Sequence, residues 1–293
     1  MPEVILIDDP EDPRIADYRD VRERDLVGRR GLFVAEGAVV LGRLVASPRF
    51  ETVSVLIAEK RLERLATVLA GLPEATPVYA AGQAALDAIV GFHLHRGILA
   101  IGRRVEAPEP EALLAGLPER ALAVGLVGAA NHDNVGGVFR NAAGFGADAV
   151  MLDATACDPL YRKAIRVSVG AALITPFARL AAGADMVSLF EGQGFEVFAL
   201  SPSGTMTLAE VRRPARAAVI LGAEGPGLPP ALMARTRTVR IPMAAGFDSL
   251  NLATASGIVL HHMAGGRRLR PSTRAFGAAQ DDERGGSQSR SSC

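Results

Sequence analysis

The sequence predicts an α/β protein of two units, in which the larger unit contains a parallel β-sheet. Apolar residues make up 49% of the 293 residues, which is enough for a sizeable core. Short β-rich runs alternate with longer runs of helical spacing along most of the chain. The run at 121–128, ALAVGLVG, is apolar throughout, which is typical of a parallel strand covered on both faces.

The first unit, residues 1–108, is predicted to be a small α/β domain. We expect strands at 31–34, 52–57, 77–79 and 97–101, and helices at 38–46, 61–70 and 83–90. The following stretch, VEAPEPEALLAGLPE, breaks the pattern with its prolines and glutamates. Residues 109–119 are therefore expected to form a linker or a short connecting helix.

The second unit, residues 120–266, continues the alternation. We expect strands at 121–128, 149–152, 196–200, 217–221 and 239–241, and helices at 135–145, 163–172, 186–191 and 251–262. Such a βα series predicts a parallel sheet. Residues 267–293 contain few apolar side chains and are predicted to be a disordered tail.

The charge balance gives no global sign of a polyanionic partner, because 32 basic residues face 32 acidic ones. Any affinity for nucleic acid must come from local patches. Lysine occurs only at Lys60 and Lys163, so nearly every cation is an arginine, whose planar fork suits phosphate but which also serves as an ordinary surface residue. The segment 19–30, RDVRERDLVGRR, is either such a patch or a salt-bridged helix.

Cysteine usage and the N-terminus indicate a cytoplasmic protein. Cys157 and Cys293 are too few for a disulfide framework or a metal-ligand cluster, so no metal is expected. The start of the chain lacks a signal-peptide pattern, and no long uncharged apolar run follows, so we expect no membrane association.

The first segment that carries chemistry is NHDNVGGVFRNAAGFGADAV, directly after the apolar strand. Asn134 is expected to cap the helix that follows, and Gly136 and Gly137 permit close backbone approach. Arg140 lies within the first turns and is expected to face the strand ends. The segment could hold a phosphate or ribose, or it could be a capped helix with a surface arginine.

The second segment is AVILGAEGPGLPP, a buried strand that runs into a turn rich in glycine and proline. At the carboxyl end of a parallel strand, such a loop lies where open α/β sheets bind ligands. It lacks the Gly-Lys-Ser/Thr ending of a phosphate loop and the spacing of a dinucleotide fingerprint. Glu224 alone could be a solvated loop carboxylate.

The third segment is RIPMAAGFDSLNLATASGIVLHHM, in which a short strand leads through a loop to an apolar helix. Ser249 and Asn251 stand at the head of that helix, where both residue types favour caps. Small residues from Ala253 onward allow close approach to another backbone. His261 and His262 are adjacent and lack partners at metal spacing, so they are interpreted as structural or surface residues.

In this order the three segments resemble the three motifs of the SpoU (TrmH-like) family of RNA 2′-O-ribose methyltransferases, in the SPOUT superfamily. Asn134, Gly136 and Arg140 fit the first motif, LGAEGPGL fits the second, and IPM followed by SLN fits the third. RKAIRVSVGAAL resembles the family's basic segment, and RRGLFVAEGAVVLGRLV is similar to its small RNA-binding domain. The departures are Asn141, Ala253 and Thr254, where Thr, Ser and Val are common.

The resemblance implies a C-terminal trefoil knot, a homodimer, and methyl transfer from S-adenosylmethionine to rRNA or tRNA. It implies a polar cluster of Asn134, Arg140, Glu224, Ser249 and Asn251. It implies a donor pocket lined by Leu221, Gly222, Ala223, Gly225, Gly227, Ile241, Met243 and Leu250. A guanidinium stays protonated in proteins, so Arg140 is interpreted as an orienting group and phosphate clamp, and the proton acceptor stays open.

Two other classes of function fit parts of the sequence. A Rossmann-type nucleotide-dependent oxidoreductase would share the βα pattern, although the fingerprint is missing. A catalytically silent RNA-binding or assembly protein would keep the fold without the activity. A small molecule or a protein could also replace RNA as the methyl acceptor.

Overall fold

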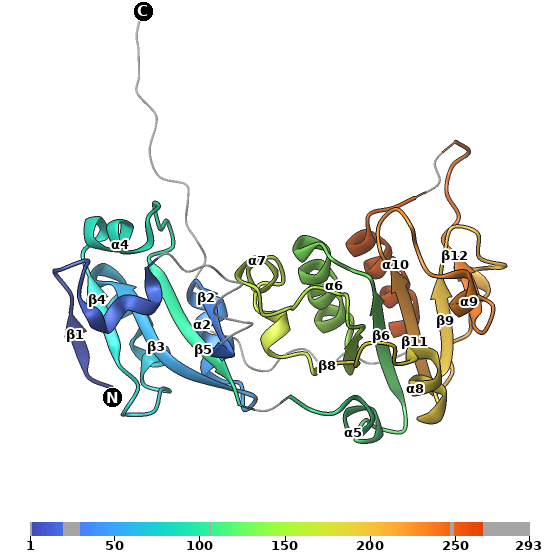
Figure 1. Ribbon diagram of the computed structural model, residues 1–293, viewed down its shortest axis with the longest axis horizontal. Coiled ribbons are helices and arrows are strands. Elements are labelled where there is room, and N and C mark those ends of the chain that lie inside the picture. The colour runs from blue at the N-terminus through green and yellow to red at the C-terminus, as the bar shows by residue number, and fades with distance from the viewer. Residues whose placement is uncertain (1, 20–29, 106, 247–248, 266–293) are drawn as a thin grey trace, which may run out of the picture.

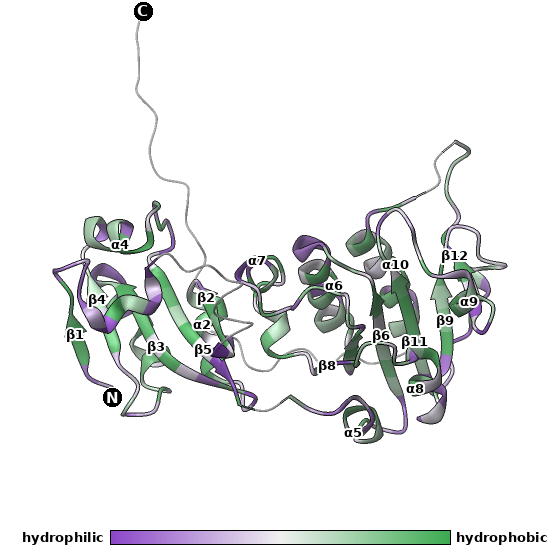
Figure 2. Ribbon diagram, in the orientation of Figure 1, coloured by the Kyte–Doolittle hydropathy of each residue, from purple (hydrophilic) through white to green (hydrophobic). Residues whose placement is uncertain are grey.

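The computed structural model describes residues 2–19, 30–105, 107–246 and 249–265, and contains two β-sheets that lie side by side (Figure 1). Residues 20–29, within the arginine-rich segment, and the predicted tail at 267–293 lie outside the described residues. Figure 2 shows apolar residues concentrated along the strands of both sheets. The cores therefore lie between the sheets and the helices that cover them.

The first sheet has the order β1-β4-β3-β5-β2 among the described residues. Its strands are β1 (Val4–Leu6), β2 (Leu32–Glu36), β3 (Phe50–Ala58), β4 (Val78–Ala81) and β5 (Ile98–Arg104). β1, β4 and β3 run parallel, whereas β5 is antiparallel to both β3 and β2. Four of these strands coincide with predicted ones, and β1 was not predicted because only three residues form it.

Helices cover both faces of this sheet. They are α2 (Ala38–Val45), α3 (Leu62–Leu69) and α4 (Gln83–Val90), with short 3₁₀ turns η1 (Pro13–Tyr18) and η2 (Glu59–Arg61). Neighbouring residues of β3 alternate between the faces: Ile57 belongs to the core under α2 and α3, and Leu56 to the core under α4. The three predicted helices are thus confirmed, with α4 at the expected bounds.

The second sheet has the order β10-β12-β9-β11-β6-β7-β8 among the described residues, and all its strand pairs are parallel. Its strands are β6 (Ala121–Val127), β7 (Ala149–Leu152), β8 (Phe177–Arg179), β9 (Glu196–Leu200), β10 (Met206–Thr207), β11 (Arg216–Gly222) and β12 (Arg237–Arg240). The predicted α/β class with a parallel sheet is confirmed. β8 and β10 were not predicted.

Both faces of the parallel sheet are covered. One face carries α6 (His132–Phe145), α7 (Arg162–Val167) and α10 (Leu252–Ala264), and the other carries α5 (Pro110–Ala115), α8 (Met186–Gly192) and α9 (Pro230–Met233) (Figure 1). In β6, Val124 packs toward α6 and Ala123 toward α8. This two-sided burial is why the strand at 121–128 reads as continuously apolar.

The start of α6 and the end of α7 differ most from the prediction. Asn134 is not the N-cap of α6: Asn131 caps the helix by accepting from Asp133 N at 2.9 Å, and Asn134 lies in the first turn. The helix predicted over 163–172 ends at Val167, because Val169 and Gly170 have φ angles of 54° and 78°. A separate 3₁₀ turn, η3 (Ala171–Leu173), follows.

Side chains from β2 and from the loop after α2 form polar contacts with the unit that contains the second sheet. Glu36 at the end of β2 is 8% exposed and forms an ion pair of 2.8 Å with Arg162 of α7. Ser47 Oγ donates to Leu173 O at 3.0 Å, and Arg49 Nη2 donates to Thr175 O at 2.9 Å. The junction is therefore held by several directed polar contacts as well as by apolar packing.

Candidate functional site

Three loops meet at the carboxyl edge of the parallel sheet. They follow β9, β11 and β12, which are adjacent in the strand order. Because neighbouring parallel strands end at the same edge, loops that are distant in sequence come together there. This is the usual position of ligand sites in open α/β sheets.

The loop after β11 is a tight turn that needs glycine. Gly227 N donates to Ala223 O at 3.1 Å, and Gly225 and Gly227 have φ angles of 86° and 67°. A Cβ on Gly222 would lie 2.6 Å from both Gly227 C and Leu228 N. The glycine at 222 is thus required by the loop's own backbone, in addition to any demand of a ligand.

Asn251 connects the three sequence segments. Its Oδ1 accepts from Ala253 N at 3.0 Å and Thr254 N at 3.2 Å, so it is the N-cap of α10. Its Nδ2 donates to Asn134 Oδ1 at 2.8 Å and to Glu224 Oε1 at 2.9 Å. Asn134, Glu224 and Asn251 therefore form one hydrogen-bonded cluster, which we call the polar triad.

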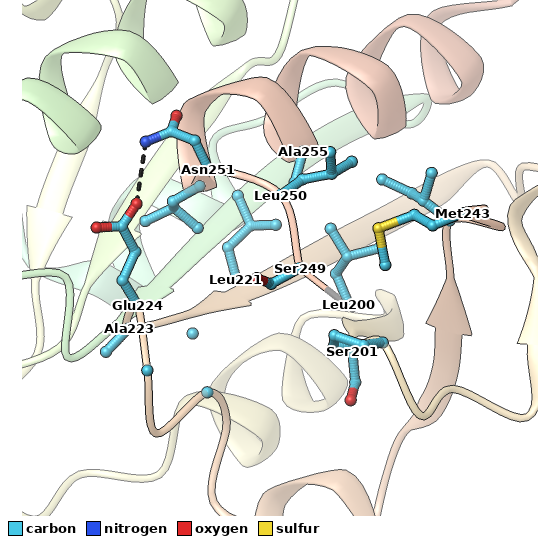
Figure 3. Close-up of a pocket in the computed structure, with 16 residues that line it drawn as sticks. Leu200, Ser201, Leu221, Ala223, Glu224, Met243, Ser249, Leu250, Asn251 and Ala255 are labelled. Carbon is cyan, nitrogen blue, oxygen red and sulfur yellow. Dashed lines mark hydrogen bonds between the residues drawn. The ribbon is translucent and has the colours of Figure 1, made fainter. Parts of the chain in front are cut away.

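A cavity of about 450 Å³ opens beside the polar triad, a size typical of small-molecule sites. In Figure 3 Glu224 and Asn251 face one another at one end, and Leu200 and Met243 lie at the other. All eight predicted pocket residues line the cavity, namely Leu221, Gly222, Ala223, Gly225, Gly227, Ile241, Met243 and Leu250, and Glu224, Ser249 and Asn251 line it too.

Sequence reasoning missed five lining residues: Leu200, Ser201, Pro202, Leu252 and Ala255. Leu200 is the last residue of β9, and Ser201 and Pro202 follow it. The residues of β9 do not indicate that this strand lies beside β11 in the sheet. The other two belong to the helix already assigned to the third segment, so its small and apolar inner face was the available signal.

Two of the predicted site residues do not line the cavity. Asn134 is 5% exposed and is connected to the site by its hydrogen bond to Asn251. Arg140 is exposed in the third turn of α6, because the helix begins at His132, and it is not among the residues that line the cavity. The structure therefore brings Asn134, Glu224, Ser249 and Asn251 together and leaves Arg140 outside that group.

Close packing of α6 on α10 fixes the polar triad. A Cβ on Gly137 would lie 2.4 Å from Ala253 Cβ, so the helices approach where both residues are small. Asn141 Nδ2 donates to Ala253 O at 2.7 Å and to Ser256 Oγ at 2.9 Å. Asn141 and Ala253, two departures from the common family pattern, are thus direct neighbours.

Within the described ranges, no group of three or more His, Cys, Asp or Glu could hold a metal ion. His262 instead approaches Val211 O at 2.9 Å, and His261 packs against Phe145 with ring centroids 5.6 Å apart. Both contacts fit the structural role expected for these histidines. No helix in the described part of the chain is long and apolar enough to cross a membrane.

Comparisons with known proteins agree with this architecture. The family model described as "SpoU rRNA Methylase family" matches residues 121–261. An uncharacterized tRNA/rRNA methyltransferase of Mycobacterium bovis is 40% identical over 276 residues, covering 90% of this chain and 93% of that protein.

Solved structures share the fold. An AdoMet-bound rRNA methyltransferase from Sinorhizobium meliloti superposes with a TM-score of 0.74 at 22% identity, covering 89% of this chain and 97% of the other. An RNA 2′-O ribose methyltransferase superposes with a TM-score of 0.72 at 24% identity, and the match covers 89% of this chain and 98% of the other.

The parallel sheet, the cavity at its carboxyl edge and these matches define the class of protein as an RNA methyltransferase. Within that class, the chain belongs to the SpoU family. The resemblance carried by the three motifs is thereby confirmed, and the dinucleotide-dependent oxidoreductase does not fit this family.

Proposed function

We propose that the protein transfers the methyl group of S-adenosylmethionine to a ribose 2′-hydroxyl of rRNA or tRNA. The observation that carries this proposal is the polar triad beside the cavity of about 450 Å³. The relative from M. bovis is described as a tRNA/rRNA methyltransferase, and one structural neighbour as an RNA 2′-O ribose methyltransferase. The first description supports RNA as the acceptor, and the second supports the ribose 2′-hydroxyl.

The cavity fits the methyl donor chemically. Leu221, Leu250 and Met243 offer apolar surface for an adenine ring, and the loop 222–227 offers backbone groups that can hydrogen-bond adenosine. When bound, the sulfonium supplies an electrophilic methyl group. Its amino-acid end would lie toward the polar groups of Ser249 and Glu224.

The residues of the polar triad have different proposed roles: Asn251 positions Glu224, and Glu224 accepts a proton. Asn251 uses both amide hydrogens, one on Asn134 and one on Glu224, so its position is fixed. It holds Glu224 through Oε1, and no bond within the described residues occupies Glu224 Oε2. We assign Glu224 Oε2 as the acceptor of the ribose hydroxyl proton, because a ribose hydroxyl is a weak nucleophile at neutral pH.

The proposal extends to architecture. We infer that residues 1–108 form the domain that binds RNA and that residues 120–266 form the catalytic domain. Residues 109–119 connect the two domains. The catalytic domain contains a trefoil knot near α10. A homodimer is proposed as the working form, since C2 pairs are the commonest assemblies. This division is supported by the presence of two separate sheets and by the position of α5, which follows the last strand of the first sheet and precedes the first strand of the second sheet in the chain.

Two measurements test the proposed function. Calorimetry should show binding of S-adenosylmethionine and none of NAD. RNA from a strain that lacks the enzyme, incubated with protein and donor, should gain a ribose 2′-O-methyl mark at defined positions, read as a bond resistant to alkaline hydrolysis. Donor binding without any mark on RNA would favour a catalytically silent RNA-binding protein, and methyl transfer to another class of acceptor would overturn RNA as the substrate.

A further inference from the structure

Arg43 of helix α2 reaches across the junction between the two sheets to the turn after α7. Its Nη1 donates to Val169 O at 2.8 Å. Among the residues that the structure describes, Val169 is the only one other than glycine with a positive φ angle, 54°. A β-branched residue keeps that conformation only where its surroundings hold it. The partly buried guanidinium of Arg43 is therefore held at a defined place.

Arg140 comes to the same place from α6. On the face of α6 toward α7, Asp133 pairs with Lys163 at 2.7 Å, and a Cβ on Gly136 would lie 2.7 Å from Ala164 O. Arg140 follows Asp133 by seven residues and Gly136 by four, so it lies on that face one turn further along. That turn of α6 is beside the end of α7, and Arg43 contacts the turn that follows α7.

The two guanidinium groups lack a counter-ion in the part of the chain that the structure describes. No carboxylate there forms an ion pair with Arg43 or Arg140. Burial, and next the positive charge of Arg140, lower the pKa of Arg43. Like charges held together without an anion are unfavourable, and a bound phosphate would relieve them.

We infer that Arg43 and Arg140 together bind one phosphate of the RNA substrate, so that the first sheet takes part directly in substrate positioning. The inference rests on the proposed function in taking RNA as the substrate. Arg140 lies six residues after Asn134, about 9 Å along the axis of the same helix. The phosphate would thus flank the ribose that the polar triad receives.

Substitution of Arg43 tests the site. Binding of a fluorescein-labelled single-stranded RNA of mixed sequence is measured over a range of salt concentrations, together with KM and kcat for methylation of RNA from the deletion strain. Arg43→Gln should weaken RNA binding by about tenfold and reduce the salt slope by about 0.7, the value for one lost phosphate contact. Donor affinity should stay unchanged. Arg43→Lys should keep the slope, because it keeps the positive charge, and should recover only part of the affinity, because it lacks the guanidinium fork.

Two control variants separate the phosphate contact from a structural role. Ser47→Ala removes a hydrogen bond across the same junction without changing charge, and Arg64→Gln removes an exposed charge from α3. Both should leave the salt slope at the wild-type value. Arg43→Gln combined with Arg140→Gln should weaken binding by less than the product of the single effects, since both hold one phosphate.

An unchanged salt slope in Arg43→Gln, or equal losses in Arg43→Gln and Ser47→Ala, would overturn the inference. These outcomes are distinct from failure of the proposed function. If the wild-type protein binds donor and RNA yet leaves no 2′-O-methyl mark, the proposed reaction fails while the phosphate site can still be read from binding alone.

Discussion

Asn251 Nδ2 lies 2.8 Å from Asn134 Oδ1, although the two residues are 117 positions apart in the chain. The same nitrogen binds Glu224, and the side-chain oxygen of Asn251 caps α10. The amide nitrogen of Asn251 therefore positions site residues, and its amide oxygen stabilises the start of α10. This division allows the two roles to be separated by substitution.

Asn251→Asp should abolish most activity and leave the protein folded. Aspartate is as good an N-cap as asparagine, so the melting temperature should change little. It cannot donate to Asn134 or Glu224, and it places a second carboxylate beside Glu224. Single-turnover methylation should slow by about tenfold or more, the scale of a lost hydrogen bond to a charged group. Asn251→Ala should in addition lower the free energy of unfolding by about 1 kcal/mol.

Glu224→Gln should lower kcat far more than it weakens donor binding, and the fold should be kept. The amide oxygen of glutamine can still accept from Asn251, but the proposed acceptor loses its charge. General-base groups contribute roughly 100-fold or more to rate. The pH profile of kcat gives the decisive comparison: an unaltered profile in Glu224→Gln would assign proton acceptance to another group or to water.

Much of the fold could be predicted because its periodic elements are locally specified. β9 and α4 were predicted at their observed bounds, since each is bordered by residues that end it. The prediction was wrong where two residues were both suitable for the same structural position, and it missed strands that are very short. Both Asn131 and Asn134 can cap a helix, and only the tertiary bond to Asn251 shows that Asn134 is turned inward. β8 begins directly after Pro176 and has three residues, too few for a detectable pattern.

The site was less predictable from residue patterns alone. The glycine loop at 222–227 could be recognised as a ligand loop because such a turn fits no regular element. Its neighbours at 200–202 could not, because strand order is a property of the assembled sheet. The position of Arg140 likewise depends on where α6 begins, because a start at His132 places Arg140 in the third turn of the helix.

Gly222→Ala should abolish donor binding. The added Cβ would lie 2.6 Å from backbone atoms of Gly227 and Leu228, so the loop that lines the cavity must open. Gly192→Ala is the matched control, because a Cβ there meets nothing within 4 Å. Calorimetry should show no donor binding for the first variant and wild-type binding for the second. Wild-type donor affinity in a folded Gly222→Ala protein would show that this loop is not the donor pocket.

Cys157 should react slowly with thiol reagents at neutral pH. Burial raises the pKa of its thiol from 9.0 to about 11, which lowers the thiolate fraction at neutral pH by about 100-fold. In a Cys293→Ser protein, the rate of alkylation by iodoacetamide should rise tenfold per pH unit until about pH 11. A rate that levels off near pH 9 would show that the thiol is more accessible than the structure indicates.

Arg140→Ala should slow methylation by roughly 100-fold or more while donor binding and stability stay near wild type. The side chain is exposed and lies outside the donor cavity, so neither folding nor donor contacts depend on it. Its loss removes a positive fork from the site proposed to hold a phosphate beside the target ribose. Arg140→Lys should recover activity only poorly, because a point charge cannot reproduce the two-pronged geometry of a guanidinium.

The competing interpretation, that Arg140 is an ordinary surface residue of α6, predicts near-normal turnover for both variants. Arg64→Ala on α3 is the control for loss of an exposed arginine and should behave as wild type. Single-turnover methylation of the mapped RNA, measured beside donor affinity and melting temperature, separates the two interpretations. A rate in Arg140→Ala equal to that of Arg64→Ala would remove Arg140 from the reaction and, with it, one half of the proposed phosphate site.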